Sequence, residues 1–286
     1  MKHTSYPAKR VSQARWLYDS ITARKYMFLF TAFLVLVALV VTDIITGPSG
    51  LTVSEVISTI AQHREKLDAA GIPLYVDSTS DPARVLTLIR NVGLILGADE
   101  KAEELAGFVT KYTDLVDQRI NRLNLAEGWK PKVFFEWHSP YETASAETSF
   151  HKPISQAGGL NIAAGQPVHT PVVSSEWVID QNPDVIVCRV SGDATLEQML
   201  EKYEDVVSRP GWENIEAVKN HQVHVIKSDV FLTFRYPVGL LYYATWFHPE
   251  LFGDIDPEAV HREAVVTFFG EEEWEKLHQH ETFVYP

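Results

Sequence analysis

Alternating hydrophobic and polar positions predict helices and buried strands along most of this chain, most clearly at residues 171–190. Ser174 or Ser175 can cap a short helix there with its hydroxyl group. Asn182-Pro183 ends that helix, because proline cannot donate the next backbone hydrogen bond. The β-branched run at 185–188 is typical of a parallel strand covered on both faces. A helix that leads directly into a buried strand predicts an α/β domain built in layers.

The same reasoning predicts the other elements of the chain. Apolar residues at helical spacing predict helices, and short β-branched or aromatic runs predict strands. The longest helix begins at Asp99 and ends near Leu125, and its continuous apolar stripe is of the kind that usually packs into a core. The remaining predicted helices cover residues 61–70, 82–96, 150–157, 195–207, 237–247, 257–269 and 271–280, and the remaining predicted strands cover 72–76, 132–137 and 223–226.

The beginning of the chain has a different pattern. A basic arm, residues 1–25, precedes an apolar run at 26–46 whose only charged residue is Asp43. A helix needs about 20 apolar residues to cross the hydrocarbon core of a membrane, so this run predicts one transmembrane helix. A cleaved signal peptide is the competing interpretation. We prefer an uncleaved anchor, because the run is long for a signal peptide and no small-residue cleavage site follows it. The basic arm predicts that the N-terminus lies in the cytoplasm. The chain would then cross the cell membrane once, with its C-terminal domain outside the cytoplasm.

Composition and charge narrow the classes of function. Hydrophobic residues make up 45% and charged residues 22% of the 286 residues, as in an ordinary globular protein. The formal net charge of −13 argues against nucleic acid as a partner, because phosphate binding needs a basic surface. The single cysteine, Cys188, lies in a predicted buried strand. It can form no intramolecular disulfide, and a catalytic thiol is not expected there.

Motifs for catalysis and for metal binding are weak or missing in the sequence. It contains no G-x-S-x-G, no phosphate-binding loop and no H-E-x-x-H, so we expect no enzyme activity, no catalytic residue and no cofactor. The eleven histidines include two close pairs, His221 with His224 and His278 with His280. Neither pair has a convincing third and fourth ligand, so no metal site is predicted.

The loop after the strand at 132–137 is the candidate binding edge. In open α/β sheets ligands bind beyond the carboxyl ends of the strands, where Trp137, His138 and Tyr141 stand. Aromatic rings stack well on macrocycles and catecholates, although Trp137 could equally be interior and Tyr141 only at the rim. Arg235 lies beyond another strand end. It could meet an anionic ligand across a cleft, or it could simply begin the helix that follows.

Three motifs resemble the C-terminal lobe of class III substrate-binding proteins, which serve ABC importers of ferric siderophores, haem and cobalamin. They are SSEW at 174–177 with the NPD and hydrophobic strand that follow, AGGLNIAA at 157–164, and WxxIxAVKN at 212–220. The resemblance covers about residues 61–275. It implies a Rossmann-like C-terminal lobe with a parallel sheet, and a long helix that connects it to an N-terminal lobe. It also implies that Glu176 docks on arginines of the ABC permease, whereas by itself Glu176 could be only a first-turn acid stabilised by the helix dipole.

Residues 24–60 resemble another component of the same importer class, the first transmembrane helix and following segment of the permease. The chain then resembles the second half of the binding protein's N-terminal lobe, and the first half is absent. The expected organisation is a basic cytoplasmic arm (1–25), a transmembrane helix (26–46), a permease-like linker (47–60), a partial N-terminal lobe (61–98), a connecting helix (99–127) and a C-terminal lobe (128–286).

Two functions are compatible with this organisation. In the first, the protein is the substrate-binding component of an ABC importer. It captures a ferric siderophore, haem or a cobalamin-type chelate with Trp137, His138, Tyr141 and Arg235, and it docks on the permease through Glu176. In the second, the truncated and fused chain docks on an importer without binding a ligand.

Overall fold

The computed structural model describes residues 71, 75, 77, 82–123, 130–280 and 282–286. The chain divides into two compact units, residues 1–76 and 77–286, and the elements below all belong to the second. The predicted transmembrane helix at 26–46, the helix at 61–70 and the strand at 72–76 lie outside the described residues. Within the described part, no helix is both long enough and apolar enough to cross a membrane.

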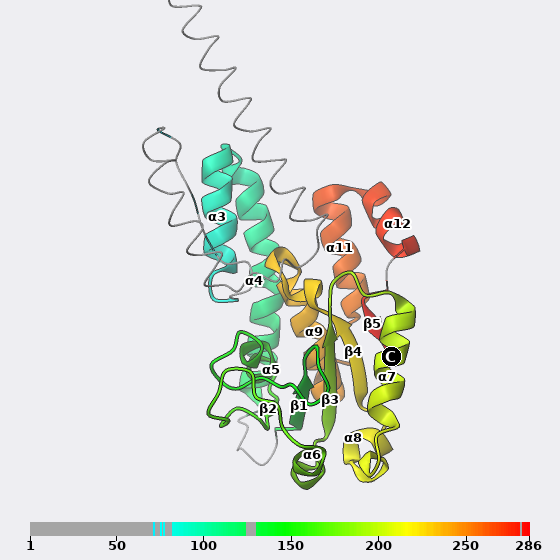
Figure 1. The fold of residues 1–286 in the computed structure, drawn as a ribbon. Helices are drawn as coiled ribbons and strands as arrows, with labels where there is room; N and C mark the ends of the chain where they lie inside the picture. The colour runs from blue at the N-terminus through cyan, green and yellow to red at the C-terminus, as the bar shows by residue number, and fades with distance from the viewer. Residues whose placement is uncertain (1–70, 72–74, 76, 78–81, 124–129, 281) are drawn as a thin grey trace, which may run out of the picture. The chain divides into compact units, whose positions relative to one another are not determined.

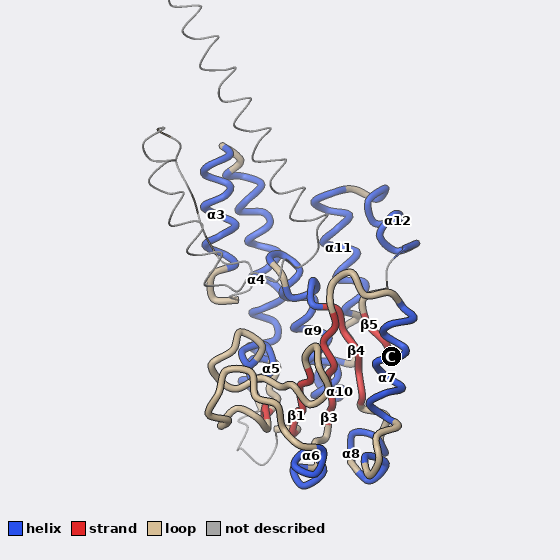
Figure 2. Tube along the Cα trace, in the orientation of Figure 1, coloured by secondary structure: helices blue, strands red, loops and turns tan. Residues whose placement is uncertain are grey.

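A mixed sheet of five strands forms the centre of this unit (Figures 1 and 2). The strand order is β2-β1-β3-β4-β5, and the first four strands are parallel. The last strand runs antiparallel to β4, so the prediction of a wholly parallel sheet was wrong at this edge. The end of the chain turns back along β4, and the Lys227 N–H donates to the Phe283 carbonyl at 3.0 Å. The strands are β1 (Lys132–Glu136), β2 (Leu160–Asn161), β3 (Val185–Val190), β4 (Val223–Lys227) and β5 (Val284–Tyr285).

The helices confirm most of the pattern predicted from hydrophobic spacing. The long helix α4 begins at Asp99 as predicted and ends at Arg122, and the predicted continuation at 124–127 lies outside the described residues. Helix α3 begins at Val85, because the residues before it form a turn. The helices are α3 (Val85–Leu96), α4 (Asp99–Arg122), α5 (His151–Gln156), α6 (Ser175–Gln181), α7 (Leu196–Val207), α8 (Glu216–Lys219), α9 (Tyr236–Phe247), α10 (Pro249–Phe252), α11 (Pro257–Phe269) and α12 (Glu271–His280), with short 3-10 helices η2 (Trp212–Asn214), η3 (Ser228–Phe231) and η4 (Thr233–Arg235).

The helix at the centre of the sequence pattern, α6, forms for the predicted reasons. Its N-cap is Ser174, whose hydroxyl accepts a hydrogen bond from the Trp177 N–H at 3.1 Å. The neighbouring Ser175 instead accepts from the indole N–H of Trp212 at 2.9 Å, which ties α6 to η2. Asn182 ends the helix in the left-handed conformation, with φ of 45°. The chain then enters β3 directly.

The glycine pair in the AGGLNIAA motif has a packing reason. Gly158 adopts a φ of +82°, which residues with a side chain rarely take. A Cβ on Gly159 would lie 2.8 Å from the Phe247 ring and 2.9 Å from Val133. The motif therefore lets the chain turn tightly from α5 into β2 while α9 packs against the sheet.

Side chains alternate between the two faces of the sheet and form two separate cores. Phe135 and Val187 belong to the core shared with α4, α9 and α11. Phe134, Ile186 and Cys188 belong to the core shared with α7 and Trp212. The Cys188 thiol is completely buried, and burial raises its pKa far above the usual range. A buried thiol of this kind is not a nucleophile.

Candidate functional site

An aromatic cluster lies at the carboxyl end of β1, where the sequence predicts the binding edge. The Trp137 ring centroid is 4.4 Å from that of Phe150 and 4.0 Å from that of His138. Phe150 in turn stacks on Phe135 at 5.2 Å. Trp137 is half-buried and His138 is exposed, so the structure brings two of the predicted ligand-binding residues together at the surface.

Arg189, near the end of β3, extends into this cluster. Its guanidinium carbon lies 4.6 Å from the ring centroid of Phe231, 4.7 Å from that of Phe150 and 5.4 Å from that of Trp137. Contacts of this length are attractive, because the face of an aromatic ring carries partial negative charge. Only 5% of Arg189 is exposed, and burial lowers its pKa to about 10. The side chain therefore remains a cation at neutral pH.

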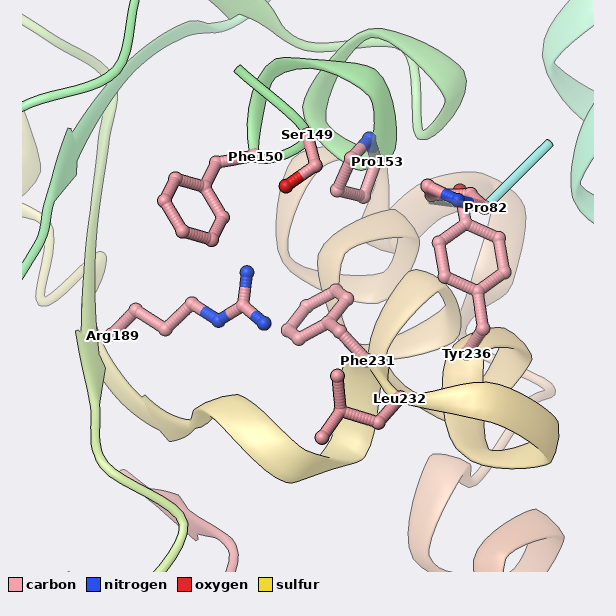
Figure 3. A pocket seen from close by; sticks show the side chains of 8 residues that line it. All are labelled: Pro82, Ser149, Phe150, Pro153, Arg189, Phe231, Leu232 and Tyr236. Atoms are coloured by element: carbon pink, nitrogen blue, oxygen red, sulfur yellow. The ribbon is translucent and has the colours of Figure 1, made fainter. Parts of the chain in front are cut away.

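The Arg189 side chain lines a small pocket (Figure 3). The side chain enters from β3, and its nitrogen atoms lie between Phe150 and Phe231. The pocket encloses about 20 Å³, close to the space of one water molecule. It is therefore large enough for one polar group of a ligand and too small for a whole chelate. It is lined by Pro82, Ser149, Phe150, Pro153, Arg189, Phe231, Leu232 and Tyr236.

The predicted cation, Arg235, has a different environment. Its guanidinium donates to the Asp229 carboxylate at 2.7 Å and lies near the rings of Phe234 and Phe283, at 5.8 and 5.6 Å. The residue does not line the pocket, although its neighbours Leu232 and Tyr236 do. The cation that the structure brings to Trp137 is Arg189, and a ligand-binding role for Arg235 stays a prediction.

Tyr141 belongs to the opposite face of the sheet from Trp137. Its ring packs under the Arg209 guanidinium at 4.5 Å and meets Trp212 at 5.9 Å. Its backbone has a φ of 64°, and its N–H donates to the Glu136 carboxylate at 2.9 Å. Tyr141 is half-buried and therefore keeps some accessible surface. The structure does not bring it to the aromatic cluster of Trp137.

A buried ion-pair network holds the loop that carries these residues. Glu136, fully buried at the end of β1, accepts two hydrogen bonds from Arg209, at 2.6 and 2.8 Å, and one from Lys202 at 2.6 Å. Burial alone disfavours the Arg209 charge, but the hydrogen bonds and the charge of Glu136 outweigh that cost and raise its pKa. The same carboxylate accepts the N–H of Tyr141. The network therefore fixes the start of the loop to the sheet.

The loop is also paired with the segment before α6. The Trp137 N–H donates to the Glu142 carbonyl at 2.8 Å, the Thr143 N–H to Pro171 at 2.8 Å, and the Val173 N–H to Tyr141 at 3.1 Å. These bonds satisfy backbone groups that an open loop would expose. The candidate binding edge is consequently a preformed surface.

Glu176 lies in the first turn of α6 and is exposed. Its pKa is lowered by its own backbone N–H and by the Ser174 hydroxyl, as expected for an acid at a helix start. Figure 1 shows α6 next to the end of the sheet where β3 begins, whereas Trp137 follows the other end of the parallel strands. Glu176 is thus available to a partner from a surface separate from the aromatic cluster.

Three of the four histidines in the two sequence pairs have described side chains, and these three are not grouped as a ligand set. His221 is exposed, while the His224 ring is buried and stacks on Trp246 at 4.2 Å. His278 stacks on Trp274 at 5.4 Å. Across the described ranges, no three His, Cys, Asp or Glu side chains are grouped so that they could hold a metal ion.

A comparison with known protein families identifies the family of this chain. A family model described as periplasmic binding protein matches residues 48–230. The chain belongs to the periplasmic binding protein family. The match begins at residue 48 and so includes most of the segment 47–60, whose resemblance to a permease stays a prediction. The missing first half of the N-terminal lobe stays a prediction as well.

Relatives and solved structures agree with this family. The chain is 27% identical over 176 residues to the uncharacterized ABC transporter substrate-binding lipoprotein YvrC of Bacillus subtilis, which covers 60% of this chain and 52% of YvrC. It therefore spans about half the length of this curated relative. The TroA-like periplasmic binding protein FepB of Veillonella parvula is 25% identical with a TM-score of 0.64, over 74% of this chain and 67% of FepB.

Two more distant members of the fold differ in the ligands that their titles name. CeuE of Helicobacter pylori, in a Ni-His complex, has a TM-score of 0.58 and 20% identity over 76% of this chain and 68% of CeuE. The periplasmic haem-binding protein RhuT of Roseiflexus has a TM-score of 0.51 and 22% identity over 67% of this chain and 71% of RhuT. These likenesses extend the TroA-like fold to the present chain and do not select a ligand.

The residue that sequence reasoning missed in this periplasmic binding protein is Arg189. A signal was present, because VIVCRV places one arginine in an otherwise apolar strand, one residue before its end. A charged residue in a buried strand needs a partner, and the carboxyl end of a parallel strand is where ligands bind. These two facts together select Arg189 from the sequence.

Proposed function

We propose that the protein is the substrate-binding component of an ABC importer that captures a metal chelate outside the membrane. The chelate would be a ferric siderophore, haem or a cobalamin-type compound. The observation that carries the ligand class is the cluster of Trp137, Phe150 and Phe231 around the Arg189 cation at the carboxyl edge of the sheet. Flat rings suit macrocycles and catecholates, and the cation suits their acidic groups.

The comparisons support the binding role and leave the ligand open. YvrC is described as an ABC transporter substrate-binding lipoprotein, and RhuT as haem-binding. MolA of Haemophilus influenzae, bound to molybdate, shares the fold with a TM-score of 0.56 at 16% identity over 73% of this chain and 68% of MolA. Proteins that share one fold bind different ligands because the side chains at their binding edges differ. The aromatic cluster is therefore a better indicator of the ligand of this chain than the fold is.

Docking on the permease is the second part of the proposal. Glu176 is exposed at the start of α6 and its carboxylate stays ionised, which suits a partner that presents arginines. The apolar run at 26–46 would anchor the chain in the cell membrane, with the binding unit outside. Binding edge and docking residue lie on different surfaces, so one chain could hold a chelate and meet the permease together.

Tryptophan fluorescence tests the capture of a chelate. The full-length protein, purified in mild detergent, would be titrated with a ferric siderophore panel, haemin and cyanocobalamin. Saturable quenching is expected, because the chelate would lie against Trp137. The Trp137→Phe variant should lose most of this quenching, while Trp177→Phe, on α6, should keep it. A folded protein whose fluorescence ignores every chelate would refute the capture role.

A function in docking alone is favoured by a separate observation. The pocket is too small to enclose a chelate, and the end of α3 exposes Val92, Leu94, Ile95 and Leu96, the last three by 60% or more. Exposed apolar residues at such density are typical of a surface that meets a protein partner. A reconstituted siderophore-class permease separates the two functions. Glu176→Arg should weaken its binding, Asp180→Arg on the same helix should not, and a docking-only chain should bind without any chelate.

A further inference from the structure

A second pocket, larger than the one that Arg189 lines, lies between helices α4 and α5 and the start of α9. It encloses about 120 Å³. A cavity of about 150 Å³ can hold a benzene molecule, so this volume has room for a ligand of about six to eight non-hydrogen atoms. We call it the α4–α5 pocket, and its walls include Leu86, Val109, Asp117, Lys152, Gln156 and Tyr236.

A chain of hydrogen bonds orients the polar wall of this pocket. The Tyr236 hydroxyl donates to Gln156 Oε1 at 2.5 Å, and Gln156 Nε2 donates to Asp117 Oδ1 at 3.0 Å. Tyr236 is 3% exposed and belongs to α9, so the core holds one end of the chain in place. Among the described residues, Asp117 Oδ2 receives no hydrogen bond. The carboxylate is therefore held in one orientation with an oxygen left to accept a donor.

Lys152, one turn before Gln156 on α5, brings the opposite charge to the same pocket. Its side chain is exposed, so the pocket can be reached from solvent. Within the part of the chain that the structure describes, neither Lys152 nor Asp117 forms a salt bridge, with the other or with a third residue. The ammonium group has three donors. A cation and an anion that line one small cavity without pairing suit a ligand that carries both charges.

The apolar part of the wall sets the shape of the remaining group. Val109 is 2% exposed on α4, and Leu86 is half-buried on α3. Their branched aliphatic side chains favour an aliphatic group of the ligand, because its burial removes apolar surface from water. The volume excludes a macrocycle or a whole chelate.

We propose that the α4–α5 pocket binds a small aliphatic amino acid. The ammonium group of the ligand would meet Asp117, its carboxylate would meet Lys152, and its side chain would lie against Leu86 and Val109. This site is distinct from the candidate binding edge, since neither Trp137 nor Arg189 lines it. The inference therefore goes beyond the capture of a chelate and does not depend on it.

Three ligands of one shape test the need for both charges. L-valine carries an ammonium group and a carboxylate, isovalerate lacks the ammonium group, and isobutylamine lacks the carboxylate. In calorimetric titrations of the full-length protein in mild detergent, L-valine should bind with a Kd of about 1 mM. Each analogue should bind at least about tenfold more weakly. Failure of L-alanine, L-serine and L-valine to bind, or equal affinity for valine and an analogue, would overturn the proposal.

Variants assign the two charges. Asp117→Asn keeps the acceptor for Gln156 and removes the negative charge, and it should weaken valine binding about tenfold. Lys152→Met should weaken it to a similar extent. Asp114→Asn and Lys101→Met change exposed residues of α4 that do not line the pocket, and both should bind like the wild type. Unchanged valine affinity in Asp117→Asn would refute the assignment.

The same variants separate this inference from the proposed function. Asp117→Asn should keep the fluorescence quenching by a chelate, and Trp137→Phe should keep valine binding. A protein that binds valine and ignores every chelate would refute the capture role and support the amino-acid site. A protein that binds a chelate and ignores all three amino acids would do the reverse.

Discussion

Two buried arginines, Arg209 after helix α7 and Arg189 near the end of β3, have very different partners in this fold. Arg209 is 6% exposed and shares two hydrogen bonds with the buried Glu136. Arg189 is 5% exposed and has aromatic rings and one carbonyl for partners. The two therefore differ little in burial and much in compensation. Arg209 is thus compensated by a buried carboxylate, while Arg189 forms no salt bridge in the described structure and is compensated mainly by aromatic rings.

The same difference separates the two faces of the sheet. On the Arg209 side the polar network joins Lys202 and Tyr141 to the end of β1, so each charge has its partner before any ligand arrives. On the Arg189 side a pocket stays open beside the guanidinium. The two faces of the sheet therefore differ in how completely their buried charges are compensated.

Breaking the Arg209 network should have the largest effect. Glu136→Gln removes the buried carboxylate between Lys202 and Arg209 and leaves Arg209 only the half-exposed Asp205, so the free energy of unfolding should fall by about 3–5 kcal/mol. Urea denaturation followed by circular dichroism measures the loss. The double variant Glu136→Met with Arg209→Met should recover part of it, because an apolar pair carries no unmatched charge. A single variant as stable as the wild type would contradict the structural role of the network.

A buried histidine shows a third arrangement, in which the buried group stays neutral. Lowering the pH tests this arrangement. His261 is 1% exposed, and its ring meets those of Trp274 and Phe283. Burial, with the nearby Arg235 charge, lowers its pKa from 6.5 to about 4. Between those pH values the unfolded chain binds a proton that the folded chain does not. The free energy of unfolding should therefore fall as the pH drops from 6.5 to 4, by on the order of 3 kcal/mol.

Replacing the histidine isolates this effect. His261→Phe removes the titrating group and also the buried Nε2, which has no hydrogen-bond partner in the described structure. Its free energy of unfolding should decline less than that of the wild type over the same pH window, by the amount given above. Urea denaturation at pH 7, 5.5 and 4 measures both proteins. Parallel pH curves would show that His261 does not titrate with folding.

Elements with a complete local signal could be predicted from the sequence, and those that depend on distant contacts could not. Helix α6 and strand β3 follow from a cap, a proline and a β-branched run that stand within twenty residues of one another. Strand β5 is two residues long and exists only through pairing with β4. Its antiparallel direction has no local signal.

The candidate site shows the same limit at the level of single residues. Trp137 could be placed at the binding edge, because it directly follows a buried strand. Tyr141 stands only four residues later, but its left-handed backbone and its bond to Glu136 turn it toward the other face. Arg189 carried a signal, one arginine in an apolar strand, but the salt bridge of Arg235 with Asp229 depends on tertiary contacts that the sequence does not show.

Removing Lys202, one of the two cations around Glu136, should lower the free energy of unfolding less than removing the carboxylate does. Lys202 donates a single hydrogen bond at 2.6 Å, and Arg209 keeps two when it is gone. Lys202→Met should lower the free energy of unfolding by about 1–2 kcal/mol, since the methionine can still cover the apolar part of the site. Urea denaturation of Lys202→Met and Glu136→Gln under the same conditions compares their losses of unfolding free energy. A loss as large as that of Glu136→Gln would mean that Arg209 alone cannot compensate the carboxylate.

The smallest effect on stability is expected at Arg189, and its sign completes the comparison. Arg189→Met removes a buried charge that forms no salt bridge in the described structure, although the charge of Asp229 acts on it, and replaces it with an apolar chain of similar length among three aromatic rings. The cation–π attraction that is lost and the desolvation cost that is relieved oppose each other, so the free energy of unfolding should change by less than about 1 kcal/mol. Arg209→Met, measured beside it in urea, should lose several times more, because the buried Glu136 would keep only Lys202 and the Tyr141 N–H as donors. If Arg189→Met lowered the free energy of unfolding as much as Arg209→Met, the aromatic rings would compensate the charge as well as a carboxylate does. Arg189 would then have the same structural role as Arg209.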